Sequence, residues 1–487
     1  MKLIQITAIF LMGMVTAMAN DLSKSIIKVS TTLQSYNASQ PWEKTAPSKR
    51  RGLGAVLNGQ KVLTTAEMVA NSNFIELETA DGLHTFPAKV NAVDYEANLA
   101  LVVPTTDKGK EALSKAKPFE LSSPVELKDE VEIVQLEDNG MTIVTEGRLQ
   151  GADIVSSFVD GHYFLTYEIK ASLQSAANSY TIPVLHKGKL LGLLTSYSSK
   201  DQLLDVIAPE IVAAFLKDAA DGDYVGFPSL GIASTATTDP NFRDWLKLSD
   251  EQGGLYITRV QPDSPASKAG IEKGDVLLAI DGNEIDRKGF YRANGYGQLY
   301  WTHLIRGVKS TGDTVTMTVL RDGKKSQHSA VLTRTPEGII PSHTYDRAPR
   351  FLVKGGLIFQ ELSSSYLQAF GKDWENRAPI NLLDALNHPE DYEEGRNRIV
   401  FISATIPTPA TLGYEKVNSA IVTKVNGQDI ADIPSLIQAL SKPNEQGIHT
   451  IEIDESPNKI YLDSKTSDTV DRQLLLRGLP SLSRETE

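Results

Sequence analysis

The sequence predicts a mostly β protein of about three domains, and three observations support this prediction. Short runs of strand-forming residues follow one another, with Gly, Asn and Asp between them and little helical periodicity. The chain has 487 residues, more than one hydrophobic core usually serves. It has no cysteine, so disulfides are excluded and each domain depends on its own core.

The charge balance argues against nucleic acid as a general partner. The net charge is −12 at pH 7, whereas phosphate binding needs clustered Lys and Arg. The one basic cluster of note, Lys49-Arg50-Arg51, is interpreted as a solvated loop. The eight histidines are scattered singly and lack metal-ligand spacing. We therefore expect no metal site and no cofactor.

Residues 1–19 have the pattern of a signal peptide. Lys2 supplies the positive start, the following stretch is mostly apolar, and Ala17-Met18-Ala19 fits the small-x-small cleavage rule. An uncleaved membrane anchor is the alternative, but the apolar stretch is short and interrupted. We expect an exported protein, periplasmic or secreted, with no membrane span after the signal peptide is removed.

The first large region, residues 20–218, is predicted to be a β-barrel or sandwich that opens with a strand at residues 25–30. Its other predicted strands are 53–57, 61–64, 74–78, 85–93, 99–103, 131–135, 142–149, 163–169 and 182–197. The stretch 203–217 carries a helical stripe instead, with Pro209 at the start of the helix. Residues 218–223 follow as a linker.

The second region, residues 223–335, combines several pieces in a characteristic order. An apolar turn at Ser229-Leu230-Gly231-Ile232 is followed by a strand, then by a short helix that ends at Gly270. A Gly-Asp-Val-Leu-Leu strand then leads into an Asp-Gly turn that ends at Gly282. This order resembles a PDZ domain.

A third region, residues 350–475, repeats these features more weakly. Gly356-Leu357-Ile358-Phe359 resembles the apolar turn, and an Asn-Gly turn ends at Gly427. A helix is predicted at 433–440, opened by Pro434. The region is interpreted as a second, divergent PDZ-like domain, and the last dozen residues, 476–487, as a polar and frayed tail.

The first region resembles a chymotrypsin-like serine protease in two hairpins. In such enzymes a His follows a Leu-Thr-x-Ala run and an Asp precedes Leu-Ala-Leu; here these places hold Glu67 and Asn98. A protease-like region followed by two PDZ-like domains resembles the HtrA/Deg family, in layout most like the plant Deg proteases. The resemblance implies a chymotrypsin-like double β-barrel and a homo-oligomer, a trimer or a cage of trimers. It also implies unfolded exported proteins as partners. Trp42 is then either a core residue or a contact between subunits.

The sequence predicts that the protease-like site does not cut. The family's nucleophile turn is Gly-rich, whereas the matching stretch here has no glycine between Lys170 and Lys187, so we expect no oxyanion hole. The nucleophile place falls on one of Asn178, Ser179 and Tyr180. A carboxylate such as Glu67 is a weak base toward a serine hydroxyl. We expect Glu67 to pair with the Asn98 amide, or else to be solvated and unpaired.

The PDZ resemblance implies that peptides or protein C-termini bind by adding a strand to a sheet edge. The candidate peptide-binding residues are Ser229, Leu230, Gly231 and Ile232, unless this stretch is a plain core hairpin. Gly356-Leu357-Ile358-Phe359 is a weaker candidate, and the second PDZ-like domain could serve assembly instead. The preferred interpretation is a pseudoprotease with a chaperone or scaffold role in protein quality control. Two alternatives are a serine endopeptidase with a rewired site and a regulatory subunit of an active paralogue.

Overall fold

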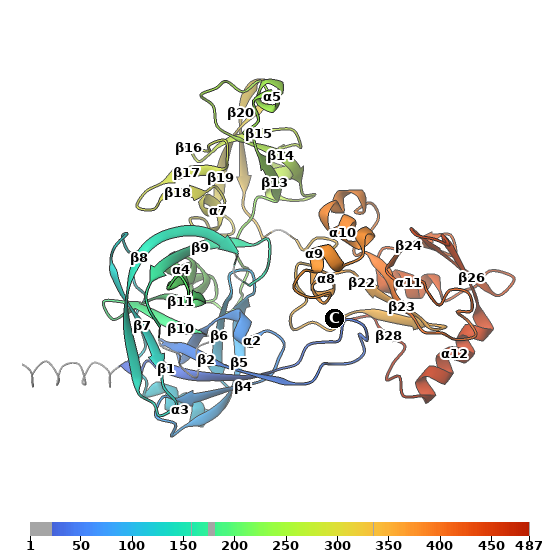
Figure 1. Cartoon of the computed structure of the whole chain (residues 1–487), viewed down its shortest axis with the longest axis horizontal. Coiled ribbons are helices and arrows are strands. Elements are labelled where there is room, and N and C mark those ends of the chain that lie inside the picture. The colour runs from blue at the N-terminus through green and yellow to red at the C-terminus, as the bar shows by residue number, and fades with distance from the viewer. Residues whose placement is uncertain (1–21, 157, 174–180, 335, 487) are drawn as a thin grey trace, which may run out of the picture. The chain divides into compact units, whose positions relative to one another are not determined.

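The computed structural model describes residues 22–156, 158–173, 181–334 and 336–486 (Figure 1). The chain forms two compact units. The first consists of residues up to Leu33 together with Lys49–Pro336, and the second of Gln34–Ser48 together with Glu337–Glu487. The predicted signal peptide, the one basis for the predicted export, lies outside the described residues.

The first unit begins with two closed β-barrels, each of six strands. The first barrel has the order β1-β2-β3-β6-β5-β4 and the second the order β10-β11-β12-β9-β8-β7. The strands of the first barrel are β1 (Ile26–Leu33), β2 (Ser48–Leu57), β3 (Lys61–Thr64), β4 (Ser72–Thr79), β5 (Thr85–Asp94) and β6 (Leu99–Pro104). Those of the second are β7 (Glu130–Leu136), β8 (Thr142–Ser156), β9 (Tyr163–Lys170), β10 (Ile182–His186), β11 (Lys189–Ser198) and β12 (Leu203–Ile207). The predicted mostly β fold with a double barrel is confirmed.

Two details of the barrels differ from the prediction. Residues 203–207 form strand β12, because their alternate side chains bury against the barrel; helix α4 (Pro209–Asp218) starts at the predicted Pro209. The basic run at 49–51 belongs to strand β2 rather than to a solvated loop. Its central residue, Arg50, is half-buried because Glu67 neutralises it.

The first PDZ-like domain is a sheet in the order β13-β14-β15-β19-β20, with β16 paired to β15 and a separate hairpin β17-β18. Its strands are β13 (Ile232–Ala236), β14 (Leu255–Val260), β15 (Val276–Ile280), β16 (Asn283–Glu284), β17 (Phe290–Ala293), β18 (Gly297–Tyr300), β19 (Thr314–Arg321) and β20 (Lys324–Val331). Its short helices are α5 (Pro240–Trp245), α6 (Pro265–Lys268) and α7 (His303–Arg306). One continuous hydrophobic cluster includes Leu53, Tyr167 and Leu277, so the barrels and this domain share buried surface.

The second unit is built on an eight-stranded sheet in the order β27-β26-β24-β23-β22-β21-β28, with β25 paired to β24. Its strands are β21 (Phe351–Lys354), β22 (Leu357–Glu361), β23 (Val400–Thr405), β24 (Ala420–Val425), β25 (Gln428–Asp429), β26 (Ile448–Ile453), β27 (Lys459–Asp463) and β28 (Ser483–Arg484). Helices α8 (Ser364–Gln368), α9 (Trp374–Arg377), α10 (Ile380–Asn387), α11 (Ile433–Ala439) and α12 (Ser464–Leu476) complete it. The predicted helix at 433–440 is confirmed, with Asp432 as its cap.

The prediction of a frayed tail is wrong for the described residues 476–486. Strand β28 pairs with β21, and Leu479 and Leu482 pack against the buried Phe351. A pair of leucines among polar residues supplies enough apolar surface to dock the segment. Trp42 belongs to the same cluster, with its ring 5.9 Å from that of Phe351, so it is a packing residue within its own chain.

Among the described residues, no helix combines the length and apolar character needed to cross a membrane. The same part of the chain contains no group of three or more His, Cys, Asp or Glu residues arranged to hold a metal ion.

Candidate functional site

The two residues at the predicted triad places, Glu67 and Asn98, lie in the first barrel. Glu67 is on the short helix α2 (Ala66–Val69), which directly follows strand β3, and Asn98 lies in the turn between β5 and β6. Asn98 has a φ of 55°, a conformation that Asn tolerates better than most residues, and is 1% exposed. The fold therefore brings together the two positions that the sequence comparison singled out.

Glu67 and Asn98 are in contact, but through different atoms from those expected. The Asn98 Oδ1 accepts a hydrogen bond from the backbone N–H of Glu67 at 2.9 Å, so the amide holds the start of helix α2. The Glu67 carboxylate turns instead to Arg50, at 3.5 Å. Arg50 also donates a hydrogen bond to the backbone carbonyl of Glu67. The expected pairing of carboxylate with amide is therefore replaced by an ion pair and a backbone cap.

The orientation of the Glu67 side chain does not favour a role as general base. Its carboxylate faces the Arg50 guanidinium, whereas a base must face the hydroxyl whose proton it takes up. Next to this pair the buried hydroxyls of Thr65 and Thr181 are hydrogen-bonded at 2.8 Å, which ties the first barrel to the start of β10. The third triad place, at Asn178, Ser179 or Tyr180, lies outside the described residues.

The predicted peptide-binding turn lines a pocket of about 250 Å³ in the first unit. All four predicted residues, Ser229, Leu230, Gly231 and Ile232, belong to its wall. The others are Gly161, His162, Tyr163, Ala233, Arg259, Gln261, Trp301, Thr302 and Arg306. Sequence reasoning found the turn but missed the contribution of the barrel loop at 161–163 and of the residues around α7.

The backbone of this turn requires glycine at position 231. Gly231 has a φ of 71°, and a Cβ there would lie 2.3 Å from the Cβ of Ser264. The Ser229 hydroxyl accepts a hydrogen bond from the Gly231 N–H at 3.1 Å, which fixes the turn. Strand β13 starts at its end and is the edge strand of its sheet. A turn of this kind beside a free strand edge has the geometry needed for strand addition.

The chemistry of the wall favours a negatively charged ligand group. Arg259, Arg306 and His162 line the pocket, and no acidic residue is among the described residues of its wall. Two further polar atoms of the wall, Trp301 Nε1 and Thr302 Oγ1, are buried without a hydrogen-bond partner among the described residues. A buried polar atom without a hydrogen bond costs about 1–3 kcal/mol. If the wall rearranged so that these two atoms bonded to a polar ligand, part of this energy would be regained.

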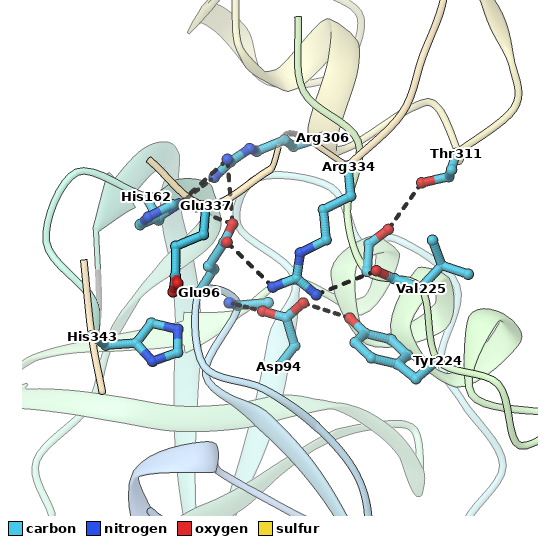
Figure 2. A network of polar contacts seen from close by, with 12 residues as sticks. Asp94, Glu96, His162, Tyr224, Val225, Arg306, Thr311, Arg334, Glu337 and His343 are labelled. Carbon is cyan, nitrogen blue, oxygen red and sulfur yellow. Dashed lines mark hydrogen bonds and ion pairs between the residues drawn. The ribbon is translucent and has the colours of Figure 1, made fainter. Parts of the chain in front are cut away.

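A cluster of charges connects this pocket to the first barrel (Figure 2). The Glu96 carboxylate, two residues before Asn98, contacts His162 Nδ1 at 2.9 Å, Arg306 at 3.4 Å and Arg334 at 3.5 Å. His162 Nδ1 also lies 3.4 Å from Arg306, but the shorter contact identifies it as a donor to Glu96. Burial alone would raise the pKa of Glu96, but the hydrogen bond from His162 and the charges of the two arginines lower it to about 2.

A second buried contact of the same region joins β5 to the linker after α4. The Tyr224 hydroxyl donates to Asp94 Oδ2 at 2.6 Å, as Figure 2 shows. Burial, followed by repulsion from Glu96, raises the pKa of the Asp94 carboxyl. Tyr224 and Asp94 are 130 positions apart, and His162 and Arg306 of the Glu96 cluster are 144 positions apart. None of these residues belongs to a motif, so the contacts could not have been found from the sequence.

The weaker candidate, Gly356-Leu357-Ile358-Phe359, has a different surrounding. Gly356 forms the turn between β21 and β22, and the three apolar residues belong to β22 and are buried. No part of this stretch lines the described pocket of the first unit.

Comparison with known proteins agrees with this architecture. PDZ domain profiles match residues 228–332 and 340–478. The putative protease Do-like 3, mitochondrial, of Arabidopsis thaliana is 26% identical over 466 residues, which cover 95% of this chain and 79% of that protein. The protease Do-like 2, chloroplastic, of the same plant is 25% identical over 417 residues, 85% of this chain and 67% of the relative.

More distant relatives extend the comparison. The periplasmic serine endoprotease DegP of Escherichia coli (strain K12) is 23% identical over 297 residues, 60% of this chain and 58% of its own length. Among solved structures, a variant of the HtrA-type protease AlgW with decapeptide superposes with a TM-score of 0.51 at 18% identity. That match covers 65% of this chain and 97% of the other, and it supports the fold.

Two closed barrels followed by two PDZ domains define a PDZ-containing protein with the architecture of a trypsin-like protease. With relatives of the same layout along most of its length, the chain belongs to the HtrA/Deg family.

Proposed function

We propose that this protein binds peptides or protein C-termini in its first PDZ domain and does not hydrolyse them. The observation that carries the proposal is the state of the two triad places. Glu67 is paired with Arg50, and Asn98 accepts a hydrogen bond from the backbone of Glu67, which supports the proposal that neither serves as a base or orients one. Removal of a single triad member already costs several powers of ten in rate.

Peptide binding is supported by the pocket and by the free edge beside it. A peptide that extends β13 would place its C-terminal carboxylate at the turn of residues 229–232. Arg259 and Arg306 in the same wall would attract that charge. Because His162 and Arg306 also contact Glu96, a ligand in this pocket would act on the ion cluster that reaches the first barrel.

The wider biological role follows from the predicted signal peptide and from the family. We propose an exported protein, periplasmic or secreted, that forms a homo-oligomer such as a trimer. It would hold unfolded exported proteins as a chaperone or scaffold in protein quality control. The named relatives are proteases, so the loss of hydrolysis is the part of the proposal that most needs a test.

The decisive test of inertness combines a covalent probe with a substrate. The purified protein and its Ser179→Ala variant are treated with a fluorophosphonate and, separately, incubated with casein. We expect no label and no casein fragments from either protein. Label or cleavage that disappears in the Ser179→Ala variant would refute the proposal and identify a rewired serine endopeptidase.

The test of peptide binding uses two matched glycine variants. Gly231→Ala inserts a Cβ that clashes with Ser264 at a φ of 71°. Gly282→Ala creates the same kind of strain at a φ of 79°, but its Cβ would meet no atom within 4 Å and lies outside the pocket. We expect Gly231→Ala to weaken binding of short peptides with a free C-terminus by at least about tenfold. Gly282→Ala should leave the affinity unchanged; equal affinities for both variants would contradict the assigned pocket.

A further inference from the structure

The two PDZ domains can be matched strand by strand from their pairing. The sheet β13-β14-β15-β19-β20 of the first corresponds to β22-β23-β24-β26-β27 of the second. Irregularities of register recur at equivalent places: β14 and β23 each carry one extra residue, Thr258 and Ser403. Strands β15 and β24 likewise each carry one, Leu278 and Thr423. Strand β22 is therefore the counterpart of β13, the strand to which a peptide would add.

The free edge of β13 has no counterpart in the second domain, because β21 pairs with β22 along that edge. The pairing is antiparallel, from Phe351 opposite Gln360 to Lys354 opposite Leu357. A peptide bound by a PDZ domain also runs antiparallel to this strand, with its C-terminus toward the turn. The end of β21 leads directly into the turn at Gly355 and Gly356, so the chain continues where a ligand carboxylate would end.

The side chains of β21 occupy both of its faces. Leu352 packs in one cluster with Leu357 and Phe359 of β22 and with Ile433 and Leu436 of helix α11. Phe351 and Val353 are fully buried in a separate cluster on the opposite side. An apolar residue of β21 thus lies in the groove between strand and helix that a ligand side chain would fill.

The outer edge of β21 is closed as well. Strand β28 pairs with it, and the Val353 N–H donates to the Leu482 carbonyl at 2.6 Å. The Arg484 guanidinium lies 5.3 Å from the Phe351 ring centre and 4.9 Å from that of Tyr36, and it donates to the Pro41 carbonyl at 3.1 Å. The segment 34–48 is thereby held over β21 and β28.

We propose that β21 is a built-in ligand of the second PDZ domain, locked by β28 and the segment 34–48. The second domain consequently binds no peptide by strand addition, and of the two PDZ domains only the first keeps an open strand edge at this place. The claim about the second groove is independent of the proposed function; only the assignment of a peptide site to the first domain rests on it.

Amide hydrogen exchange of the full chain tests this inference, with and without short peptides that end in Val, Leu or Phe. We expect residues 351–354 and 357–361 to exchange slowly and at the same rate in both conditions, and residues 229–236 to slow when peptide is added. A peptide-induced change at 351–361, or exchange at 351–354 as fast as in the exposed linker residues 220–223, would overturn the built-in ligand. If 229–236 does not respond, the proposed function fails, whereas slow exchange at 351–354 still supports the filled groove.

A matched pair of arginine variants tests the lock. Arg484→Gln removes the contacts to Phe351, Tyr36 and Pro41, and we expect exchange at 351–354 to accelerate by about tenfold through local opening. Arg472→Gln alters an exposed arginine of helix α12 whose described side-chain contact is with Thr469, and it should leave this exchange unchanged. Equal rates in the two variants would refute the role of β28 as the lock.

Discussion

The two PDZ domains share strand order, turns and register irregularities, and yet they differ at the one edge that matters for binding. In the first, β13 ends the sheet and its turn opens into a pocket. In the second, β22 lies inside the sheet because β21 and β28 continue it. The comparison teaches that a shared motif fixes the geometry of a groove, while the chain around it decides whether the groove is free.

The largest expected difference between the two domains is at equivalent positions of strands β13 and β22. Leu357 is fully buried, so Leu357→Ala should lower the free energy of unfolding of the second unit by about 2–5 kcal/mol and leave peptide affinity unchanged. Ile232 is only half-buried and lines the pocket, so Ile232→Ala should chiefly weaken peptide binding, by about tenfold.

Denaturant unfolding followed by domain-specific hydrogen exchange, together with peptide titration, measures both effects. The comparison fails if Leu357→Ala weakens peptide binding, or if Ile232→Ala destabilises its unit as much as Leu357→Ala destabilises the other.

The second largest expected difference between the two domains is in how their stability changes at acidic pH. Burial lowers the pKa of His303, in the first domain, to about 4, and its Nδ1 lies 2.5 Å from the Tyr291 hydroxyl. Because the folded-state pKa lies below the unfolded value of 6.5, the neutral ring stabilises the fold above pH 6.5. This stabilisation, about 3 kcal/mol, is lost as the pH falls from 6.5 to about 4.

The second domain also has a histidine with a lowered pKa, His449 on strand β26, where burial and then the charge of Lys354 lower the pKa. Thermal unfolding between pH 7 and pH 4, in the protein and in His303→Gln and His449→Gln variants, separates the two contributions. We expect the His303 variant to remove most of the pH dependence of the first unit in this window. An unchanged pH profile would contradict the assignment.

The smallest expected effect concerns two tryptophans. Trp42 packs on Phe351, so Trp42→Ala should destabilise the second unit by about 1–2 kcal/mol and speed tryptic cleavage after Lys44. Trp245 is 68% exposed on helix α5 of the first domain, and Trp245→Ala should change stability by less than about 0.5 kcal/mol. Chemical unfolding and limited proteolysis of the two variants side by side measure the difference, and equal effects would show that the segment 34–48 does not protect β21.

Much of the site could be predicted because its residues stand at recognisable motif positions. Glu67 and Asn98 were identified from the hairpins around them, and Ser229–Ile232 from an apolar turn with glycine. The partner of Glu67 could not be predicted, because Arg50 stands in a basic run that gives no sign of its orientation in strand β2. The ion cluster around Glu96 was missed for a similar reason, since its members carry no local pattern.

The sequence by itself determined the mostly β architecture, the two PDZ domains and the identity of the residues, Glu67 and Asn98, at two motif positions of the first barrel. These are local properties: alternation of side chains, glycine at turns and the chemistry of single residues. Only the tertiary structure decided which strand edge is free, what neutralises Glu67 and where the last residues of the chain lie. Strand pairing and burial join segments far apart in sequence, and the three apolar residues at 351–353 have the same composition whether they add to a sheet or remain in a loop.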